Sequence, residues 1–362
     1  MRVGILTFHN AHNYGAVLQA YALQTKLKEL GYDVSIINYC PHYIEDKYKL
    51  FFKKNNHLNT FKKIKVNLGL LYTMRRKIKR ISCFKKFSKN NLLLTTKLNP
   101  KTLKLIEQFD CLVLGSDQIW NPLLTDGYDP FYFGCIEGCN FQGRVVSYAA
   151  SMEFDKIYDE QKLISLISKV NAIGVRESGL KKVLETVVNK NIEVNIDPTF
   201  LLTSEEWDKI SAQVEINEPY LLIYENLTSK KTFEIADKIA LKLGLKIKVI
   251  TVDISWRDKK HFLSTASPEE FISYFKNAAF VLTTSFHGTA FSIIYNKPFI
   301  TLRLNQGADK RSESLLKMLN LSSRFLEPDK FNLLNDIDYY YVNDILNTER
   351  NKAITFLREN IK

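Results

Sequence analysis

Residues 283–300, TTSFHGTAFSIIYNKPFI, place a polar Ser-Phe-His-Gly between two apolar runs. The run before it, Ala279–Leu282, predicts a buried strand, and Thr289–Tyr295 after it predicts a short buried helix. His287 therefore lies where a strand passes into a helix. In a parallel α/β sheet this point is the carboxyl edge, where ligands bind and exposed helix N–H groups attract anions. The stretch thus predicts an α/β fold with a binding site at a sheet edge.

Strand-like and helix-like segments alternate along the N-terminal part of the chain. Apolar residues at spacings of four and three from Ala16 to Leu30 predict a helix that ends at Gly31. The predicted strands are Arg2–Phe8, Asp33–Tyr39, Cys111–Gly115, Val145–Ala149, Ala172–Val175 and Ile192–Ile196. Such a βαβ series predicts a mostly parallel sheet with right-handed crossovers.

A second series of the same kind begins near Pro219. Ser267-Pro268-Glu269-Glu270 has the N-cap, the proline and the third-position glutamate that start a helix. The predicted strands are Tyr220–Tyr224, Lys246–Thr251, Ala279–Thr283 and Phe299–Leu302, and the predicted helices are Lys231–Leu243, Glu269–Phe275, Thr289–Tyr295 and Asn343–Asn360.

The length of 362 residues exceeds the size at which a single core usually stops growing. We therefore predict two Rossmann-like domains facing a cleft. The N-terminal domain covers residues 1–205, the C-terminal domain covers 206–335, and a C-terminal helical segment over 336–362 packs back across the hinge.

The net charge of +12 comes from one stretch, residues 47–89, here called the basic segment. It carries 15 Lys or Arg and no Asp or Glu, which leaves 36 basic against 39 acidic residues elsewhere. Apolar side chains such as Phe61 and Phe84 are interleaved with the charges. This pattern suits an anionic membrane surface or a polyphosphate ligand, and a solvated helical insertion explains it equally well. We expect no nucleic-acid partner, because no nucleic-acid motif accompanies the charge.

The N-terminal MRVGILTF is too short an apolar run for a signal peptide, and no stretch approaches the ~20 apolar residues of a membrane span. The five cysteines are odd in number and scattered, which is typical of reduced thiols. We expect a cytoplasmic protein, either free or peripheral on the inner face of the cell membrane through the basic segment.

Polar loops follow four of the predicted strands, at Phe8–Gly15, Gly115–Pro122, Arg176–Glu177 and Ser285–Gly288. Because the carboxyl ends of parallel strands share an edge, we expect these loops to converge. Each loop by itself also has a structural explanation. Asn13 and Gly15 could cap a helix, Asp117 could be a turn residue or N-cap, and His287 could be a satisfied core histidine.

Metal and nucleotide cofactors find little support. His9 and His12 have no Cys or carboxylate partner beside them in the sequence, and Asp336 and Asp338 lie outside the βαβ pattern. The first strand is not followed by Gly-x-Gly-x-x-Gly, and the chain has no Walker lysine loop. We expect no metal and no cofactor.

Seven blocks in order resemble the pattern of bacterial polysaccharide pyruvyl transferases. They are FHNAHNYGAVLQAYAL, GSDQIWNP, SYAASM, GVRESG, IDPTFLL, TTSFHGTAFSIIYNKPF and DKRSESLLKMLNL. The resemblance runs from the first strand to about Phe325 and leaves out the basic segment. It implies a fold similar to that of GT-B glycosyltransferases, without their nucleotide-sugar donor.

The resemblance also implies a reaction. Members transfer the enolpyruvate-derived unit of phosphoenolpyruvate to a sugar of a surface polysaccharide or of its lipid-diphosphate-linked precursor, form a pyruvate ketal and release phosphate. The reaction needs anchors for a phosphate and a carboxylate, an acid for the methylene carbon and a base for the sugar hydroxyl. Phosphoenolpyruvate would be a substrate, so no cofactor is implied.

The donor side is implied residue by residue. His287 and Arg176 occupy the positions that line the phosphoenolpyruvate site in related enzymes, and a guanidinium fork suits a carboxylate or phosphate. Some members carry a second arginine where this chain has Ser285, so Arg303 or Arg311 would have to supply that charge. The remaining predicted donor contacts are Gly288 and Thr289, whose helix N–H groups can receive phosphate.

On the acceptor side, Asp117 is the predicted base or hydrogen-bond partner of the sugar. Asn13, Gly15 and Gln118 are predicted to shape this side of the site.

Two other functions stay open at this point. One is a nucleotide-sugar-dependent glycosyltransferase on the same fold, although no Glu lies between Ser285 and Arg311, where such enzymes often bind the donor ribose. The other is a non-catalytic protein that binds an anionic glycolipid through the basic segment.

Overall fold

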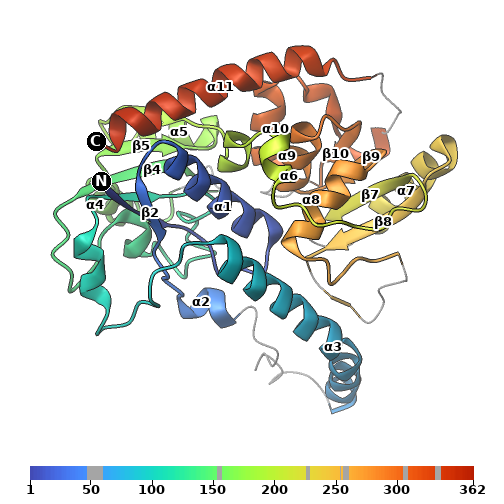
Figure 1. Cartoon of the computed structure of the whole chain (residues 1–362), viewed down its shortest axis with the longest axis horizontal. Coiled ribbons are helices and arrows are strands. Elements are labelled where there is room, and N and C mark those ends of the chain that lie inside the picture. Colours follow the sequence, from blue (N-terminus) through green and yellow to red (C-terminus); the bar gives the residue numbers. More distant parts are fainter. Residues whose placement is uncertain are drawn as a thin grey trace.

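The computed structural model describes residues 1–46, 60–152, 157–225, 229–252, 254–255, 261–304, 309–330 and 336–362, with side chains from residue 73 onward in the helix that begins at residue 60. Residues 47–59 of the basic segment lie outside this description. Two parallel β-sheets with helices packed on their faces make up the chain (Figure 1).

The N-terminal sheet has six strands in the order β2-β1-β3-β4-β5-β6. All neighbouring pairs are parallel. Every residue of β3 is buried, as an internal strand covered on both faces requires. The strands are β1 Arg2–Leu6, β2 Asp33–Ile36, β3 Cys111–Leu114, β4 Arg144–Ala150, β5 Ala172–Val175 and β6 Ile192–Val194.

The C-terminal sheet has five strands in the order β11-β10-β9-β7-β8, again all parallel. The predicted strands are confirmed to within a few residues. The short edge strand β11 was not predicted, since two residues are too few for a periodic signal. The strands are β7 Tyr220–Glu225, β8 Lys246–Thr251, β9 Phe280–Thr283, β10 Phe299–Leu302 and β11 Phe325–Leu326.

Each sheet has one point where the strand order reverses. In the N-terminal sheet it lies at β1 and β3, and in the C-terminal sheet at β7 and β9. Ligands of open α/β sheets bind outside the carboxyl ends of the strands at such points. The loops after β1, β3 and β9 are three of the polar loops singled out in the sequence.

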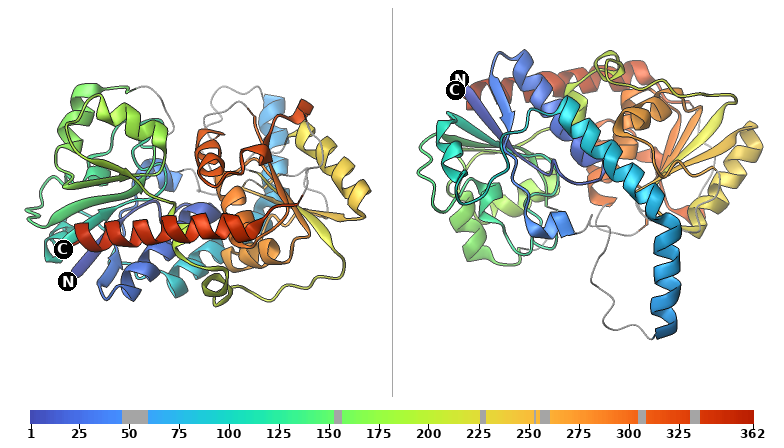
Figure 2. Two further views of the ribbon diagram at one scale, coloured as in Figure 1. Left: turned by 90° about the horizontal axis from the view of Figure 1, so that it is seen from above. Right: turned by 60° about the horizontal axis from the view of Figure 1, so that its bottom comes forward.

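The helices cover both faces of each sheet (Figure 2). α8 begins with the predicted capping box, in which Ser267 and Glu270 satisfy each other's backbone N–H groups, and Pro268 is its first residue. The helices are α1 Tyr14–Glu29, α2 His42–Glu45, α3 Thr60–Asn91, α4 Glu160–Ile167, α5 Ser178–Glu185, α6 Ser204–Asp208, α7 Lys230–Leu243, α8 Pro268–Asn277, α9 Phe286–Ile294, α10 Asp309–Met318 and α11 Tyr339–Asn360. Short 3-10 turns occupy η2 Leu103–Gln108, η3 Pro130–Phe133, η4 Pro198–Leu201, η5 Ser322–Arg324 and η6 Pro328–Lys330.

One continuous apolar core joins the two halves of the molecule. Tyr14 at the start of α1 stacks on Phe271 of α8 with the ring centroids 4.6 Å apart, and its hydroxyl donates to the carbonyl of Ala266 at 2.8 Å. Aromatic stacking and a satisfied buried hydroxyl both favour this arrangement. The two sheets are thereby held together beside the site.

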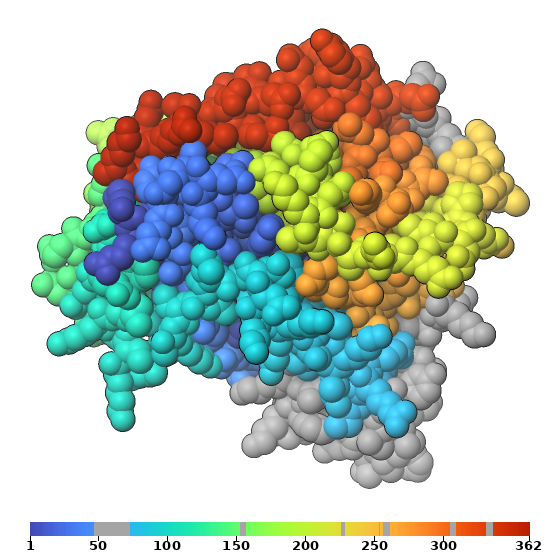
Figure 3. Space-filling view, viewed as in Figure 1, coloured from blue at the N-terminus to red at the C-terminus, as the bar shows by residue number. Residues whose placement is uncertain are grey.

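The described part of the basic segment is one long helix, α3, whose C-terminal half is not a solvated insertion. Phe84 and Phe87 are buried in the core. Arg80 is 4% exposed and donates to carbonyls of both halves, at 2.7 Å to Thr251 and at 3.4 Å to His12. In Figure 3, residues 73–91 of α3 lie along the boundary between the N-terminal and C-terminal halves.

The C-terminal helix α11 runs over both halves, from the C-terminal sheet back to the N-terminal one (Figures 1 and 2). Arg350 donates to the carbonyl of Phe200 at 2.8 Å, and Phe356, Leu357 and Ile361 are buried. No helix among the described residues is both long enough and apolar enough to cross a membrane. The domain boundaries at residues 205 and 335 stay predictions.

Candidate active site

Loops from both sheets enclose a cavity of about 220 Å³, here called the reaction cavity. Its lining comes from the loop after β1, the start of α1, α2, the loop after β3, and α9 and α10. The lining residues are Phe8, Ala11, Asn13, Ala16, Ile44, Asp117, Gln118, Leu124, Ser285, Phe286, His287 and Arg311. The structure therefore brings together most of the residues predicted for the two substrates.

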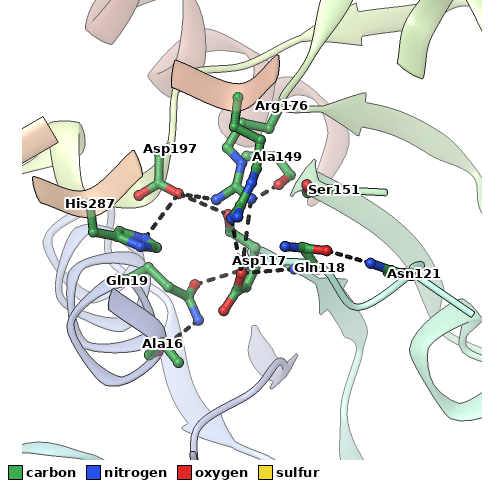
Figure 4. A network of polar contacts seen from close by, with 12 residues as sticks. Ala16, Gln19, Asp117, Gln118, Asn121, Ala149, Ser151, Arg176, Asp197 and His287 are labelled. Atoms are coloured by element: carbon green, nitrogen blue, oxygen red, sulfur yellow. Dashed lines mark hydrogen bonds and ion pairs between the residues drawn. The ribbon is translucent and has the colours of Figure 1, made fainter. Parts of the chain in front are cut away.

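Asp117 lies at the centre of the polar network (Figure 4). Its backbone has a φ of 72°, in the left-handed region that residues other than Gly rarely adopt. The turn is held because the Asp117 carbonyl accepts from the N–H of Ser151 at 3.0 Å. The carboxylate Oδ1 accepts from the N–H of Gln118 at 2.9 Å, and the amide of Gln118 in turn accepts from Asn121.

Two arginines flank this carboxylate. The distance from Asp117 Oδ1 is 3.9 Å to a terminal nitrogen of Arg176 and 4.0 Å to a terminal nitrogen of Arg311. Both separations are too long for a direct hydrogen bond. Two positively charged side chains therefore approach the same carboxylate.

Arg176 follows β5 and is held by carboxylates on its other side. Its Nη1 donates to Asp197 Oδ2 at 2.6 Å and its Nε to Glu177 Oε1 at 3.1 Å, whereas its Nη2 is buried and has no hydrogen-bond partner among the residues that the structure describes. Burial alone would raise the pKa of Asp197, but the nearby His287 and Arg176 and the hydrogen bonds from Thr199 hold that pKa below its usual value. A buried ion pair therefore fixes the guanidinium and leaves one N–H-bearing nitrogen unused.

His287 is placed in the first turn of α9, and its ring packs against Gly15 of α1. A Cβ atom at residue 15 would lie 2.0 Å from Nδ1, so no larger residue fits there. Its Nε2 is 3.8 Å from Asp197 Oδ2 and has no hydrogen-bond partner in the described part of the chain. Burial lowers the pKa of His287 to about 4, although Asp197 and Asp117 act in the opposite direction. The imidazole is therefore neutral at physiological pH.

Phe286 separates the reaction cavity from a second cavity of about 320 Å³ that is lined by Arg176, Asp197 and Arg311. The guanidinium carbons of Arg176 and Arg311 lie 4.7 and 5.9 Å from its ring centroid. Cation–π attraction holds both arginines against this ring. Phe286 thus fixes the spacing of the two charges.

Some predicted donor residues do not face either cavity. Thr289 is fully buried, its hydroxyl contacts Ser285 and Thr301, and its backbone N–H already donates to the carbonyl of Ser285 at 3.0 Å. Gly288 packs against Thr283 and is also outside both linings. Phosphate contact through these two residues therefore does not follow from the structure.

The two arginines predicted as alternatives for the donor charge differ in position. Arg311 of α10 lines the reaction cavity, whereas Arg303 pairs with Glu313 at 2.9 Å and lies over Phe325. Asn13 has two roles, because it caps α1 by accepting from the N–H of Ala16 and also lines the cavity. Gly15, which was predicted to shape the acceptor side, packs against the ring of His287 and is not part of the cavity lining.

The sequence reasoning missed Asp197, Glu177 and Phe286 as site residues. Asp197 and Glu177 stand directly in the blocks IDPTFLL and GVRESG, and an acidic residue next to a strand end was the available signal. Phe286 gave none, since an aromatic residue in an apolar helix usually marks a core position. Among the described residues no group of His, Cys, Asp and Glu has the arrangement of a metal site.

The arrangement can bind a small dianion and handle a proton. Two guanidiniums supply positive charge with a fork geometry suited to carboxylate or phosphate. A neutral imidazole and a carboxylate within the same cavity can accept protons or hydrogen bonds. Such a site favours group transfer from an anionic donor to a hydroxyl acceptor.

Several solved structures are similar to this chain in fold. The UDP-GlcNAc 2-epimerase from Methanocaldococcus jannaschii is similar with a TM-score of 0.51 at 13% identity, covering 97% of this chain and 93% of that chain. UDP-GlcNAc 2-epimerase from Neisseria meningitidis bound to UDP-GlcNAc has a TM-score of 0.48 at 11% identity, covering 99% and 100%. MurG from Acinetobacter baumannii has a TM-score of 0.41 at 10% identity, covering 99% and 98%. The fold is a GT-B arrangement of two Rossmann-like units.

No curated protein matches the chain in sequence. Residues 13–305, well over half of the chain, match the family described as polysaccharide pyruvyl transferase.

Proposed function

Because the chain belongs to the polysaccharide pyruvyl transferase family, we propose that it transfers the pyruvyl unit of phosphoenolpyruvate to a sugar of a surface polysaccharide or its lipid-linked precursor. The products are a pyruvate ketal and phosphate. The observation that carries this proposal is that Arg176 and Arg311 both approach the Asp117 carboxylate, which lines the reaction cavity together with Arg311 and His287.

The donor would lie against the two arginines. Phosphoenolpyruvate carries a carboxylate and a phosphate, and in this proposal Arg176 Nη2 and Arg311 receive one or both of them. Asp117 now lies between the guanidiniums, so donor binding would draw the arginines toward the ligand. The neutral ring of His287 adds a hydrogen-bonding group without adding charge.

The reaction balances without any further reagent. Two hydroxyl oxygens of the sugar form bonds to the central carbon of the enolpyruvate unit, and the carbon–oxygen bond to phosphate breaks. One hydroxyl proton ends on the methylene carbon, which becomes the methyl group, and the other leaves with phosphate. We assign Asp117 to the acceptor hydroxyl and His287 to the donor; both line the reaction cavity, and Asp117 is held by the N–H of Gln118.

The acceptor is proposed to be a sugar linked to a lipid diphosphate, and the enzyme would then work at the inner face of the cell membrane. The charge of the basic segment supports contact with an anionic membrane surface. Flotation with neutral and with anionic vesicles tests this contact. Equal recovery with both kinds of vesicle would count against it.

The donor is tested by calorimetric titration of phosphoenolpyruvate into the wild-type protein and the variants His287→Gln, Arg311→Gln and Arg303→Gln. The first two changes should weaken binding at least about tenfold, because each removes a charged or buried hydrogen-bonding partner. Arg303→Gln is the matched control and should leave binding unchanged, since Arg303 pairs with Glu313 away from the cavity.

UDP and GDP are titrated in parallel. Saturable binding of a nucleotide with none of phosphoenolpyruvate would show a nucleotide-sugar glycosyltransferase instead. Binding of neither donor would favour the non-catalytic glycolipid-binding protein.

A further inference from the structure

A third cavity, of about 480 Å³ and with a polar lining, lies on the other side of the loop that follows β1. It is lined by that loop, by the last turns of α3, and by the segments after β2 and α3. We call it the basic cavity. Its polar side chains include Asn10, His12, Lys85, Ser88, Lys89 and Lys97.

Two lysines give this cavity its charge. Lys85 and Lys89 are one turn apart on the same face of α3, and like charges at this spacing repel each other. Lys97 is neutralised by Glu45, which also lines the cavity, at 2.5 Å. Across the residues that the structure describes, no acidic side chain forms an ion pair with Lys85 or Lys89. Both lysines are exposed, like the rest of the basic face of α3, and their charge is accessible to a ligand from solution.

The electrostatic potential is also positive at a buried group beside the basic cavity, the imidazole of His12. Burial, together with the charges of Arg80 and Lys85, lowers the pKa of His12 to about 4. His12 therefore stays neutral and leaves the lysines as the charged groups. Neutral His12, Asn10 and Ser88 can supply hydrogen bonds beside them.

The basic cavity is next to the reaction cavity. Both are lined by Ala11, and the residues on either side of it face different cavities, Asn10 and His12 the basic cavity and Asn13 the reaction cavity. A ligand that reaches over this one loop can thus occupy both. The acceptor sugar must lie in the reaction cavity, where Asp117 is.

We propose that the basic cavity binds the diphosphate that links the acceptor sugar to its lipid carrier, an inference that rests on the proposed function. Lysines bind phosphate as compact point charges, and hydroxyl and amide groups complete the hydrogen bonding to its oxygens. The cavity is concave and adjoins the loop of the reaction site. This shape suits a discrete diphosphate better than a flat membrane surface.

The test is calorimetric titration of inorganic pyrophosphate in the presence of saturating phosphoenolpyruvate, which blocks the donor site. The variant Lys85→Gln/Lys89→Gln is compared with Lys79→Gln/Lys86→Gln. The control changes the same charge on the same helix at two exposed lysines that do not line the cavity. The first pair should weaken pyrophosphate binding at least about tenfold, and the control less than about twofold.

Flotation with anionic vesicles separates the two sources of phosphate. If the lysines serve only a membrane surface, both pairs should reduce flotation alike while neither changes pyrophosphate affinity, and the proposal fails. Equal loss of pyrophosphate affinity in both pairs would also overturn it, because the effect would then be general charge.

The outcome is separable from that of the proposed function. Suppose that phosphoenolpyruvate binds normally and that Lys85→Gln/Lys89→Gln leaves pyrophosphate affinity unchanged. This result would refute the diphosphate site and leave the proposed function standing. If phosphoenolpyruvate does not bind, pyrophosphate is titrated without it. Dependence on the two lysines would then support the anion site while the pyruvyl-transfer proposal fails.

Discussion

Gly15 and His287 are in direct contact across the two halves of the molecule, since a Cβ atom at residue 15 would lie 2.0 Å from the imidazole Nδ1. The contact joins the first turn of α1 to the first turn of α9. The position of the imidazole therefore depends on the absence of a side chain at residue 15.

Gly15→Ala should displace His287 and lower kcat/KM on the order of a hundredfold, because misplacing a catalytic group by about 1 Å has an effect of this size. The measurement is phosphate release from phosphoenolpyruvate in the presence of an acceptor. Gly179→Ala in α5 is the control, since nothing lies within 4 Å of its added Cβ. Equal activity of both variants would contradict the packing role of Gly15.

Stability should fall at acidic pH because His287 is buried in its neutral form. Above pH 6.5 the imidazole is neutral in the folded and the unfolded chain. Between 6.5 and the folded pKa of about 4, the unfolded chain binds the proton preferentially, so the free energy of unfolding decreases as pH falls. From pH 7.5 to 5 this single group should account for about 2 kcal/mol.

Denaturant unfolding at these two pH values measures the effect. The decrease should be smaller in His287→Gln than in the wild-type protein by about that amount. His12, whose pKa is also lowered to about 4, stays in both proteins and cancels in the comparison. Identical pH dependence of the two proteins would show that His287 titrates normally.

Asp197→Asn should destabilise the fold by about 3–5 kcal/mol, because removing one partner of a buried ion pair leaves the other charge uncompensated. Asp197 is 2% exposed and pairs with Arg176 at 2.6 Å. Asp329→Asn is the control, since its pair with Lys231 is on the surface, and it should change stability by less than about 0.5 kcal/mol. Urea unfolding curves check both values.

Arg80→Met should cost about 2 kcal/mol or more, since a charged donor to several buried carbonyls is lost. Arg80 donates to Thr251 and Ser264 of the C-terminal half and to His12 of the N-terminal half. The neighbouring Lys79 is exposed, so Lys79→Met should have little effect. A similar loss in both variants would point to the helix as a whole and not to the contacts of Arg80.

Asp117→Asn tests the acceptor side. If Asp117 takes the hydroxyl proton, turnover should fall by about 10²–10⁴-fold. Phosphoenolpyruvate affinity should not fall, because the change removes the negative charge that lies beside Arg176 and Arg311. A loss of less than tenfold would mean that Asp117 is not the general base. Single-turnover phosphate release and calorimetric titration separate the two effects.

The sheets could be read from the sequence because their strands are short apolar runs followed by polar loops. The stretch around His287 predicted β9 and α9, and Ser267 with Glu270 predicted the start of α8. Convergence of the loops after β1, β3 and β5 could also be predicted, since it follows from the parallel topology of their sheet. The approach of the loop after β9 depends in addition on how the second sheet faces the first.

Pairwise geometry could not be read in this way. Arg303 and Arg311 are equivalent in the sequence, and only the fold of α10 brings Arg311 to the cavity. The same holds for Asp197, which anchors Arg176 from a different loop, and for Thr289, whose hydroxyl faces the core. The burial of Phe84 and Phe87 was hidden by the lysines between them, because composition averages over the faces of a helix.

The return of α11 to the N-terminal sheet has a consequence for biosynthesis. Phe356 lies against Tyr148 and close to Gly174, and Ile361 is fully buried, so residues near the end of the chain complete the core of the half that is made first. Domains generally fold as units while the ribosome is still working. Here the N-terminal half is synthesised before α11. The apolar surface of that half which α11 covers therefore stays exposed until residue 361 has been translated.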